Sequence, residues 1–292
     1  MAENQMFRDG LLAGKRILVT GGGTGLGRAI AEHYLSLGAT VWICGRRQAP
    51  LDATVKELSQ AHGARIRAQS ADIRDPEQVN RLMETVSSEG PLTGLVNNAA
   101  GNFISPTHLV SPRGFDAVAN TVLHGTFYVT NAVGKRWIEA GLPGAIISIL
   151  TTWVWTGSPF TVPSAMAKTG LDAMTKSLAI EWGRNKIRVN AIAPGVIPTE
   201  GMSARLDPGG DSNDRGSENP WGRVGRPSEL QNLATFLMAD GCEWLSGQTI
   251  ALDGAGYLAN GTQMTRYFGL SDADWAEKKK IARQADTAGR NA

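Results

Sequence analysis

The chain has 292 residues, 42% of them hydrophobic and 19% charged, a composition that can bury a large core and argues against global disorder. Its formal net charge of +2 is close to balance, so nothing indicates an electrostatic surface for nucleic acid or for an anionic membrane. The two cysteines, Cys44 and Cys242, stand apart without CxxC or Cys/His spacing, and we therefore expect neither a disulfide framework nor a metal site.

Neither end of the sequence carries a recognisable targeting signal. The N-terminal residues lack an apolar segment with a cleavage pattern, and the C-terminal residues Gly289-Arg290-Asn291-Ala292 differ from the peroxisomal Ser-Lys-Leu signal. The chain also has no run of about 18 apolar residues that would span a membrane. We expect a cytoplasmic protein with no membrane and no nucleic-acid partner.

In chain order, short apolar runs alternate with longer segments of helical periodicity. The first run, residues 17–19, precedes a helical pattern formed by Leu26, Ile30, Tyr34 and Leu37. The runs that predict strands are residues 17–19, 40–44, 65–68, 94–97, 145–150, 187–192 and 249–252. The later segments that predict helices are residues 55–61, 78–86, 125–138, 165–182 and 228–238. This alternation is typical of an α/β fold with a doubly wound parallel sheet, the Rossmann fold.

We expect a single domain over residues 1–258, followed by a C-terminal extension over residues 259–292. Residues 208–220 interrupt the alternation, because they are polar and rich in glycine and proline, which predicts a surface loop. Such a loop at the carboxyl end of the sheet, where ligands bind, is either a substrate lid or a tolerated insertion. In the extension, residues 275–281 predict a short charged helix that packs on the surface or on a partner subunit.

The segment Thr20-Gly21-Gly22-Gly23-Thr24-Gly25-Leu26-Gly27 links the first predicted strand to the first predicted helix. Glycines let the backbone approach a pyrophosphate, and the free N–H groups of the helix N-terminus then face the anion. A glycine cluster alone is more often a plain turn, but its place between a strand and a helix predicts a dinucleotide site.

The second predicted strand ends in Gly45-Arg46-Arg47. A site for NAD would carry an acidic residue here to hold the ribose hydroxyls. An arginine can instead bind a 2′-phosphate through two hydrogen bonds, whereas a carboxylate would repel it. The pair is either a solvated basic turn or, as we expect, the mark of a site for NADP(H).

Together with the glycine loop, Asp72, Asn97-Asn98-Ala99-Ala100-Gly101, Lys168 and Pro194-Gly195 resemble the short-chain dehydrogenase/reductase family, from about Leu12 to Gly254. The resemblance implies that Asp72 binds near the adenine, that Lys168 bonds the nicotinamide ribose, and that Pro194-Gly195 holds the nicotinamide. The cofactor-binding residues expected in all are Gly21, Gly23, Thr24, Gly25, Leu26, Gly27, Arg46, Arg47, Asp72, Ile73, Asn98, Ala99, Lys168, Pro194, Gly195 and Ile197.

One position departs from the family pattern. The usual Tyr-x-x-x-Lys is here Ser164-Ala165-Met166-Ala167-Lys168, whose spacing still places Ser164 and Lys168 on one helix face. A lysine can lower the pKa of a tyrosine phenol, about 10, into a working range, and an aliphatic hydroxyl does not allow this. A simple interconversion of ketone and alcohol is therefore disfavoured.

The Ser-x-x-x-Lys variant, residues 101–107, residues 157–163 and Arg205-Leu206-Asp207-Pro208 are similar to the 2,4-dienoyl-CoA reductases within this family. The similarity implies an NADPH-dependent reductase of an unsaturated fatty acyl-CoA, assembled as a homotetramer. The catalytic residues expected are Asn102, Ser164 and Lys168. The substrate-binding residues expected are Arg46, Arg74, Phe103, Ser111, Trp153 and Arg205, the arginines near the phosphates of coenzyme A or, taken singly, ordinary surface residues.

Two positions do not fit that similarity. Those reductases carry a catalytic tyrosine just after the fifth strand, where this chain has Thr151-Thr152-Trp153. An asparagine of the central helix is replaced by His124, which is either an ordinary helix histidine or a compensating acid or water relay. Two other functions therefore stay open: an oxidoreductase for another CoA thioester, ring-derived or keto/hydroxyacyl, in a pocket shaped by Trp153 and Trp155, and a non-catalytic NADP-binding subunit.

Overall fold

A seven-stranded parallel sheet forms the centre of the computed structural model, which describes residues 6–199, 216, 219–259, 271, 273–274 and 277. The strands are β1 (Arg16–Thr20), β2 (Thr40–Gly45), β3 (Ile66–Ser70), β4 (Gly94–Asn97), β5 (Gly144–Ile149), β6 (Ile187–Pro194) and β7 (Thr249–Leu252). They lie in the order β3-β2-β1-β4-β5-β6-β7. The order reverses between β1 and β4, and a crevice for a ligand is expected at the carboxyl ends of these two strands.

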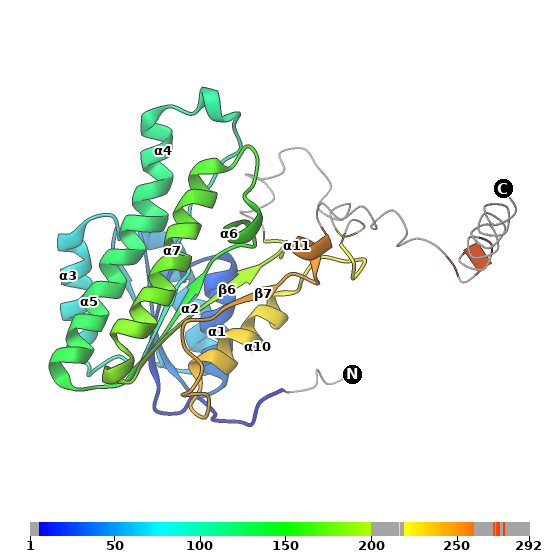
Figure 1. Cartoon of the computed structure of the whole chain (residues 1–292). Coiled ribbons are helices and arrows are strands. Elements are labelled where there is room, and N and C mark those ends of the chain that lie inside the picture. Colours follow the sequence, from blue (N-terminus) through cyan, green and yellow to red (C-terminus); the bar gives the residue numbers. More distant parts are fainter. Residues whose placement is uncertain are drawn as a thin grey trace, which may run out of the picture.

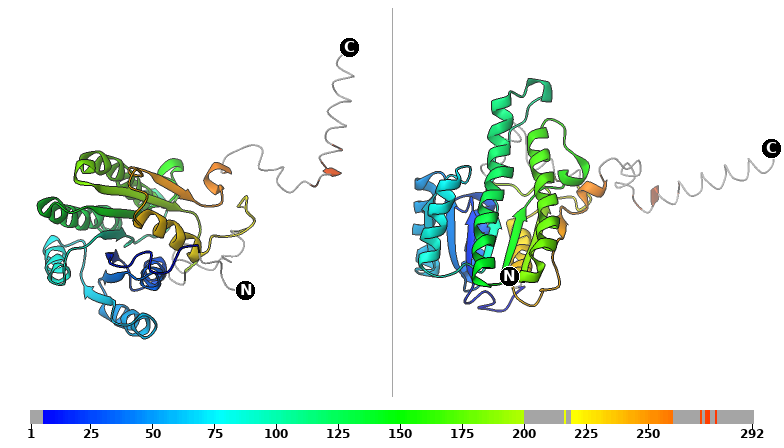
Figure 2. Two further views of the ribbon diagram at one scale, coloured as in Figure 1. Left: turned by 90° about the horizontal axis from the view of Figure 1, so that it is seen from below. Right: turned by 60° about the vertical axis from the view of Figure 1, so that its left-hand side comes forward.

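Helices cover both faces of the sheet (Figure 2). One face carries α1 (Gly25–Ser36), α2 (Gln48–His62) and α10 (Pro227–Met238), and the other carries α3 (Pro76–Ser88), α5 (Gly125–Ala140) and α7 (Val162–Glu181). Successive residues of β1 point to opposite layers: Ile17 and Val19 join the core with α1, whereas Leu18 joins the core with α3 and α5. Both layers bury the strand, which explains its unbroken apolar sequence.

The predicted α/β fold and its strands are confirmed, with small differences in length. β6 runs on to Pro194, beyond the predicted end at residue 192. α2 begins at Gln48, well before the predicted residue 55. The prediction missed these first turns because their residues show no apolar periodicity. Pro50 is tolerated there because the first turn of a helix needs no N–H donor at that position.

A helical segment before α5 is not predicted by the sequence pattern. α4 (Pro112–Ala119) begins after Ser111, whose hydroxyl accepts a hydrogen bond from the N–H of Gly114 at 3.1 Å. The π-helical turn η2 (Asn120–His124) follows at once and leads into α5, so that one continuous helical segment extends past the sheet (Figure 1). The short elements η1 (Thr107–Leu109), α6 (Trp153–Thr156), η3 (Gly183–Asn185) and α11 (Gly256–Ala259) are too brief to show a period.

Two predicted segments lie almost wholly outside the described residues. Of the loop at 208–220 only residues 216, 219 and 220 are described, and of the helix at 275–281 only residue 277. Within the part of the chain that is described, no helix combines the length and the apolar character that crossing a bilayer requires.

Candidate active site

The glycine loop between β1 and α1 has a backbone that side chains would obstruct. Gly21 and Gly25 have φ angles of +66° and +55°, in the left-handed region that favours glycine. A Cβ on Gly27 would lie 2.4 Å from both Asn98 Nδ2 and Gly21 O. α1 then begins after Thr24 with no side-chain cap and no acidic residue in its first turn, so its terminal N–H groups stay available to an anion.

Asn98, which follows β4, fastens this loop from the other side. Its Nδ2 donates to the carbonyl oxygens of Thr20 and Gly21 at 3.1 and 3.4 Å. The backbone N–H groups of Asn98 and Ala99 both donate to Thr20 Oγ1 at 3.0 Å. The carboxyl ends of β1 and β4 are thereby held together at the switch point of the sheet.

A cavity of about 280 Å³ opens above this junction. Its lining includes most of the expected cofactor-binding residues, namely Gly21, Gly23, Thr24, Arg46, Arg47, Asp72, Ile73, Asn98 and Ala99. Leu26 instead packs its side chain against the core and is not part of the lining. The cavity fits the pyrophosphate and adenosine end of a dinucleotide, because glycine backbone forms one wall and two arginines stand at another.

Several residues that line this cavity were not predicted from the sequence to bind the cofactor. Pro50, Leu51, Ala71, Ala100 and Thr121 also border the cavity. Thr121 belongs to η2, and nothing in the sequence signals that this π-helical turn would bring it there.

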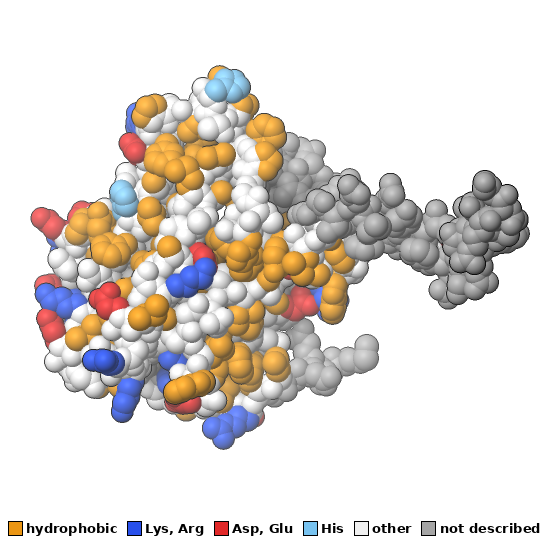
Figure 3. Space-filling view, viewed as in Figure 1, with side chains coloured by type: hydrophobic (Ala, Val, Ile, Leu, Met, Phe, Trp, Pro, Cys, Tyr) orange, Lys and Arg blue, Asp and Glu red, His pale blue; other side chains and the backbone are white. Residues whose placement is uncertain are grey.

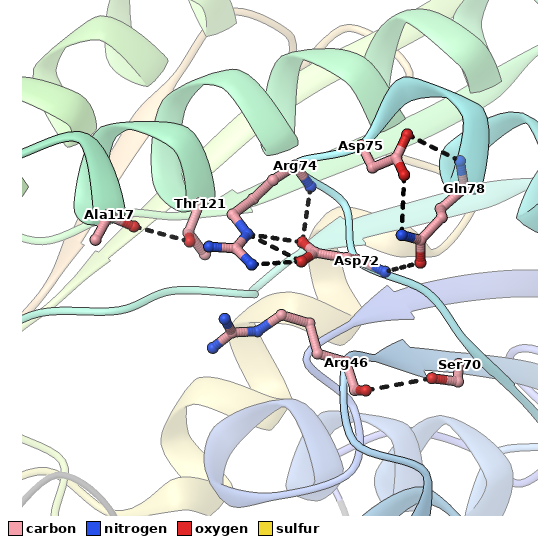
Figure 4. Close-up of polar contacts among 8 residues, drawn as sticks. All are labelled: Arg46, Ser70, Asp72, Arg74, Asp75, Gln78, Ala117 and Thr121. Atoms are coloured by element: carbon pink, nitrogen blue, oxygen red, sulfur yellow. Dashed lines mark hydrogen bonds and ion pairs between the residues drawn. The ribbon is translucent and has the colours of Figure 1, made fainter. Parts of the chain in front are cut away.

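Asp72 and two arginines form a charged cluster at the cavity (Figure 4). Arg74 Nε donates to both carboxylate oxygens of Asp72 at 2.9 and 3.0 Å, and Arg74 Nη2 donates to Oδ2 at 2.6 Å. The hydrogen bond from Arg74 is the main reason that the pKa of Asp72 lies below its ordinary value, and the charge of Arg46 adds to this. Arg46 itself is exposed, and Figure 4 shows its guanidinium extending without a bond to the other residues drawn.

Lys168 and Ser164 lie on α7 next to the end of β5. Both are buried, and Lys168 Nζ donates to the backbone oxygen of Ile149. Burial lowers the pKa of Lys168 from its ordinary value of 10.5 to about 8. The structure thus confirms that the two side chains share the inner face of one helix, as their spacing predicts.

The segment after β4 carries Asn102 and Phe103. Asn102 Oδ1 accepts a hydrogen bond from the N–H of Phe103 at 2.9 Å, which leaves its amide nitrogen to donate to a ligand. Phe103 packs against an apolar cluster that includes Val118 and Leu150. Ser111 is exposed and caps α4, so its hydroxyl already has a structural partner.

Trp153, half-buried, opens α6 directly after β5. Two residues on, Trp155 lies against Tyr257 of α11, with ring centroids 4.8 Å apart and an interplanar angle of 32°. α6 and α11 therefore meet at the carboxyl edge of the sheet (Figure 1).

The Pro194-Gly195 loop is fixed to the end of β7. The N–H of Gly195 donates to Leu252 O at 3.0 Å, and a Cβ on Gly195 would lie 2.8 Å from the Cβ of Asp253. Ile197 is buried beside it. This loop borders a second cavity of about 180 Å³ that also involves Trp221.

His124 is exposed, and its ring centroid is 6.4 Å from that of Tyr128 on α5. Tyr128 lines a surface groove between α3 and α5. The residues of η2 that face α7 are instead Val122 and Leu123: Val122 is fully buried in the cluster with Ala167 and Leu171, and Leu123 packs against that cluster. This placement fits the ordinary surface histidine that the sequence left open, and we assign no proton relay to His124.

The remaining expected residue, Arg205, lies outside the described part of the chain. Within that part, no group of three or more His, Cys, Asp or Glu side chains is arranged to hold a metal ion.

Comparison with known proteins gives relatives over nearly the whole chain. A family model described as enoyl-(acyl carrier protein) reductase matches residues 21–257. A Caenorhabditis elegans protein named "Uncharacterized oxidoreductase F53C11.3" is 41% identical over 281 residues, covering 94% of this chain and 90% of that protein. A second Caenorhabditis elegans protein, named "Probable 2,4-dienoyl-CoA reductase decr-1.2", is 40% identical over 288 residues, covering 96% of this chain and 93% of that protein. The crystal structure of a short chain dehydrogenase from Bacillus anthracis matches with a TM-score of 0.77 at 37% identity, covering 85% of this chain and 98% of that chain.

Proposed function

The chain belongs to the short-chain dehydrogenase/reductase family of oxidoreductases, and on that basis we propose that it is an NADPH-dependent reductase of an unsaturated fatty acyl-CoA. The observation that carries the proposal is the pair formed by Ser164 and Lys168. A buried lysine is kept beside the end of β5, while the residue that would be a tyrosine in a ketone reductase is a serine. Reduction of a carbon–carbon bond conjugated to a thioester needs no phenol at that position.

We assign the dinucleotide to the cavity above β1 and β4. The glycine loop and the N-terminus of α1 would hold the pyrophosphate, Asp72 would lie near the adenine, and Arg46 and Arg47 would meet a 2′-phosphate. NADPH, when bound, supplies the hydride. Lys168, Pro194, Gly195 and Ile197 would hold the nicotinamide half.

Asn102 is the donor that we assign to the substrate oxygen. Reduction of a conjugated dienoyl thioester builds negative charge on the thioester oxygen, and a fixed N–H donor stabilises that charge. The bond from the Phe103 N–H to Asn102 Oδ1 holds the amide with its nitrogen available to donate. The hydroxyl of Ser164 adds a second donor on the α7 side.

Proton delivery falls to water and to Lys168. The indole of Trp153 is a hydrogen-bond donor that does not release its proton at usable pH, so it orients an oxygen or shapes the pocket. Lys168 is protonated below pH about 8 and lies buried beside the end of β5. Its ammonium therefore supports the developing negative charge and can return a proton to a neighbouring water.

A second candidate function rests on the aromatic contact between Trp155 and Tyr257. Flat rings at this edge would favour a ring-derived acyl-CoA over a flexible chain.

We also propose a homotetramer, and a division into a domain over residues 1–258 and an extension over residues 259–292.

The experiment is NADPH oxidation measured against a panel of acyl groups, each offered as the CoA thioester and as the free acid. We expect turnover with 2,4-dienoyl-CoA and much weaker binding of the free acids, because the phosphates of coenzyme A supply charged contacts. Faster turnover of a ring-derived thioester would favour the second candidate. Tight NADPH binding with no turnover of any thioester would contradict both.

A further inference from the structure

Asp72 presents an electrostatic problem for the proposed coenzyme. Its carboxylate lines the same cavity as Arg46 and Arg47, where a 2′-phosphate would bind. A carboxylate beside a phosphate repels it unless a positive charge compensates it, and Arg46 lies close enough to Asp72 for its charge to lower the pKa of that carboxyl. The inference below rests on the proposed use of NADPH.

Arg74 donates four hydrogen bonds to the Asp72 carboxylate. Its Nε and Nη2 donate to the two oxygens at 2.6 to 3.0 Å, and its backbone N–H donates to Oδ1 at 3.1 Å. Figure 4 shows the guanidinium lying directly against the carboxylate, while Arg46 extends separately. The pair is thus internally neutral, and Arg46 keeps its charge for a ligand.

The position of this pair argues for an indirect role. Asp72 borders the cavity, whereas Arg74 is not among the residues of its lining. Asp72 is also held from behind, because its N–H donates to Gln78 Oε1 at 3.0 Å and Gln78 is bonded to Asp75, the cap of α3. Arg74 therefore has a fixed partner, and releasing it to contact a substrate would expose a carboxylate in the cavity.

We propose that Arg74 sets the preference for a 2′-phosphorylated dinucleotide by neutralising Asp72, and that it does not bind the phosphates of acyl-CoA. It is a positioning and charge-compensating residue that acts through Asp72. This assignment departs from the substrate contact that the family resemblance implies for Arg74.

The test compares the affinities of NADPH and NADH for the apoprotein, measured by calorimetric titration without substrate. Arg74→Gln should lower the preference for NADPH by about ten- to thirtyfold, because a carboxylate is uncovered near a doubly charged phosphate. The double variant Asp72→Asn with Arg74→Gln should recover most of that loss, since no unpaired charge remains. Arg74→Lys keeps the positive charge and should hold most of the preference for NADPH. If Arg74→Gln does not fold, a large loss of preference in Arg74→Lys would contradict the role of the charge.

Arg81→Gln is the matched control. It removes the same charge from α3, where Arg81 and Glu77 form an exposed pair at 3.8 Å, and it should leave the ratio unchanged. An unchanged ratio in Arg74→Gln, together with a raised KM for acyl-CoA, would overturn the inference and return Arg74 to the substrate, while leaving the use of NADPH intact. Equal affinities of the wild type for NADPH and NADH would overturn both.

Discussion

Asn102 and Trp153 differ in how they relate to the reductases that the chain resembles: Asn102 lies in a segment similar to theirs, whereas Trp153 stands just after the fifth strand, where those reductases carry a tyrosine. Asn102 has its oxygen engaged and its nitrogen free, which suits a donor to an enolate oxygen. We expect Asn102→Ala to lower kcat roughly 10²–10³-fold, as removal of an oxyanion donor does. Trp153→Phe should keep measurable activity, because it removes one hydrogen bond and no proton source.

Steady-state rates at saturating NADPH decide between these roles. Asn102→Asp is the matched variant, because it keeps the shape of the side chain but replaces the donor with an acceptor, and it should be as impaired as Asn102→Ala. An inactive Trp153→Phe alongside a nearly normal Asn102→Ala would reverse the assignment.

Lys168 makes the folded protein's stability depend on pH in a defined direction. Because burial lowers its pKa to about 8, the unfolded chain binds more protons at this side chain between pH 8 and pH 10.5. The unfolding free energy of the wild type should therefore rise with pH over this window, relative to Lys168→Met, by up to about 3 kcal/mol. Below pH 8 the penalty of burying the charge is fully present.

Urea unfolding of the wild type and of Lys168→Met, at several pH values and without coenzyme, measures this difference. Subtracting the two curves removes every titrating group that the proteins share. If the difference in unfolding free energy between the two proteins stays constant from pH 7 to pH 10, burial does not lower the pKa of Lys168.

At the scale of elements, the glycine loop and the segment after β4 must fit against each other. A Cβ on Gly27 would lie 2.4 Å from Asn98 Nδ2, so Gly27→Ala must displace the side chain that ties β1 to β4. We expect a loss of about 1–3 kcal/mol in unfolding free energy together with weaker NADPH binding. Gly183→Ala is the matched control, because a Cβ there has no heavy atom within 4 Å. Equal stability of the two variants would contradict the close approach.

The helices and strands differ in how well the sequence predicts them. The strands of the sheet are buried on both faces, and their apolar runs are visible in the sequence. η2 shows no such signal, because a π-helical turn depends on how α4 and α5 are joined, yet it brings Thr121 to the cavity. The glycine loop and the shared helix face of Ser164 and Lys168 are likewise predictable from the sequence, since both follow from spacing along one element.

Side-chain contacts, above all those between segments far apart in the chain, were not predicted from the sequence. Trp155 and Tyr257 stack across two elements far apart in the chain, and no local pattern pairs them. Arg74 lies close to Asp72 in sequence, but only the structure shows that its guanidinium turns onto that carboxylate rather than outward. His124 lies in η2, and only the structure shows that it is exposed.

At the scale of the whole molecule, α5 presents a partly apolar outer surface. Phe127 and Ile138 are exposed on it, and grooves run on either side, against α3 and against α7. Figure 3 shows hydrophobic side chains on this face of the molecule. Exposed apolar surface of this kind fits the proposed assembly of identical chains.

Phe127→Lys should therefore lower the molar mass in solution, measured by light scattering after size exclusion, from that of a tetramer. Glu57→Lys, an exposed change on α2 at the opposite face of the sheet that removes one pair with Arg28, is the control and should leave the molar mass unchanged. A wild-type chain that runs as a monomer at micromolar concentration would contradict the proposal.

Label transfer tests most directly the proposal that this molecule reduces a conjugated dienoyl thioester. The protein would be incubated with 2,4-dienoyl-CoA and NADPH carrying deuterium at the transferable position, and the product examined by NMR. We expect one deuterium at the carbon of the diene farthest from the thioester, and one solvent proton at a carbon nearer to it. Deuterium at the carbon β to the thioester, or recovery of unlabelled dienoyl-CoA, would contradict it.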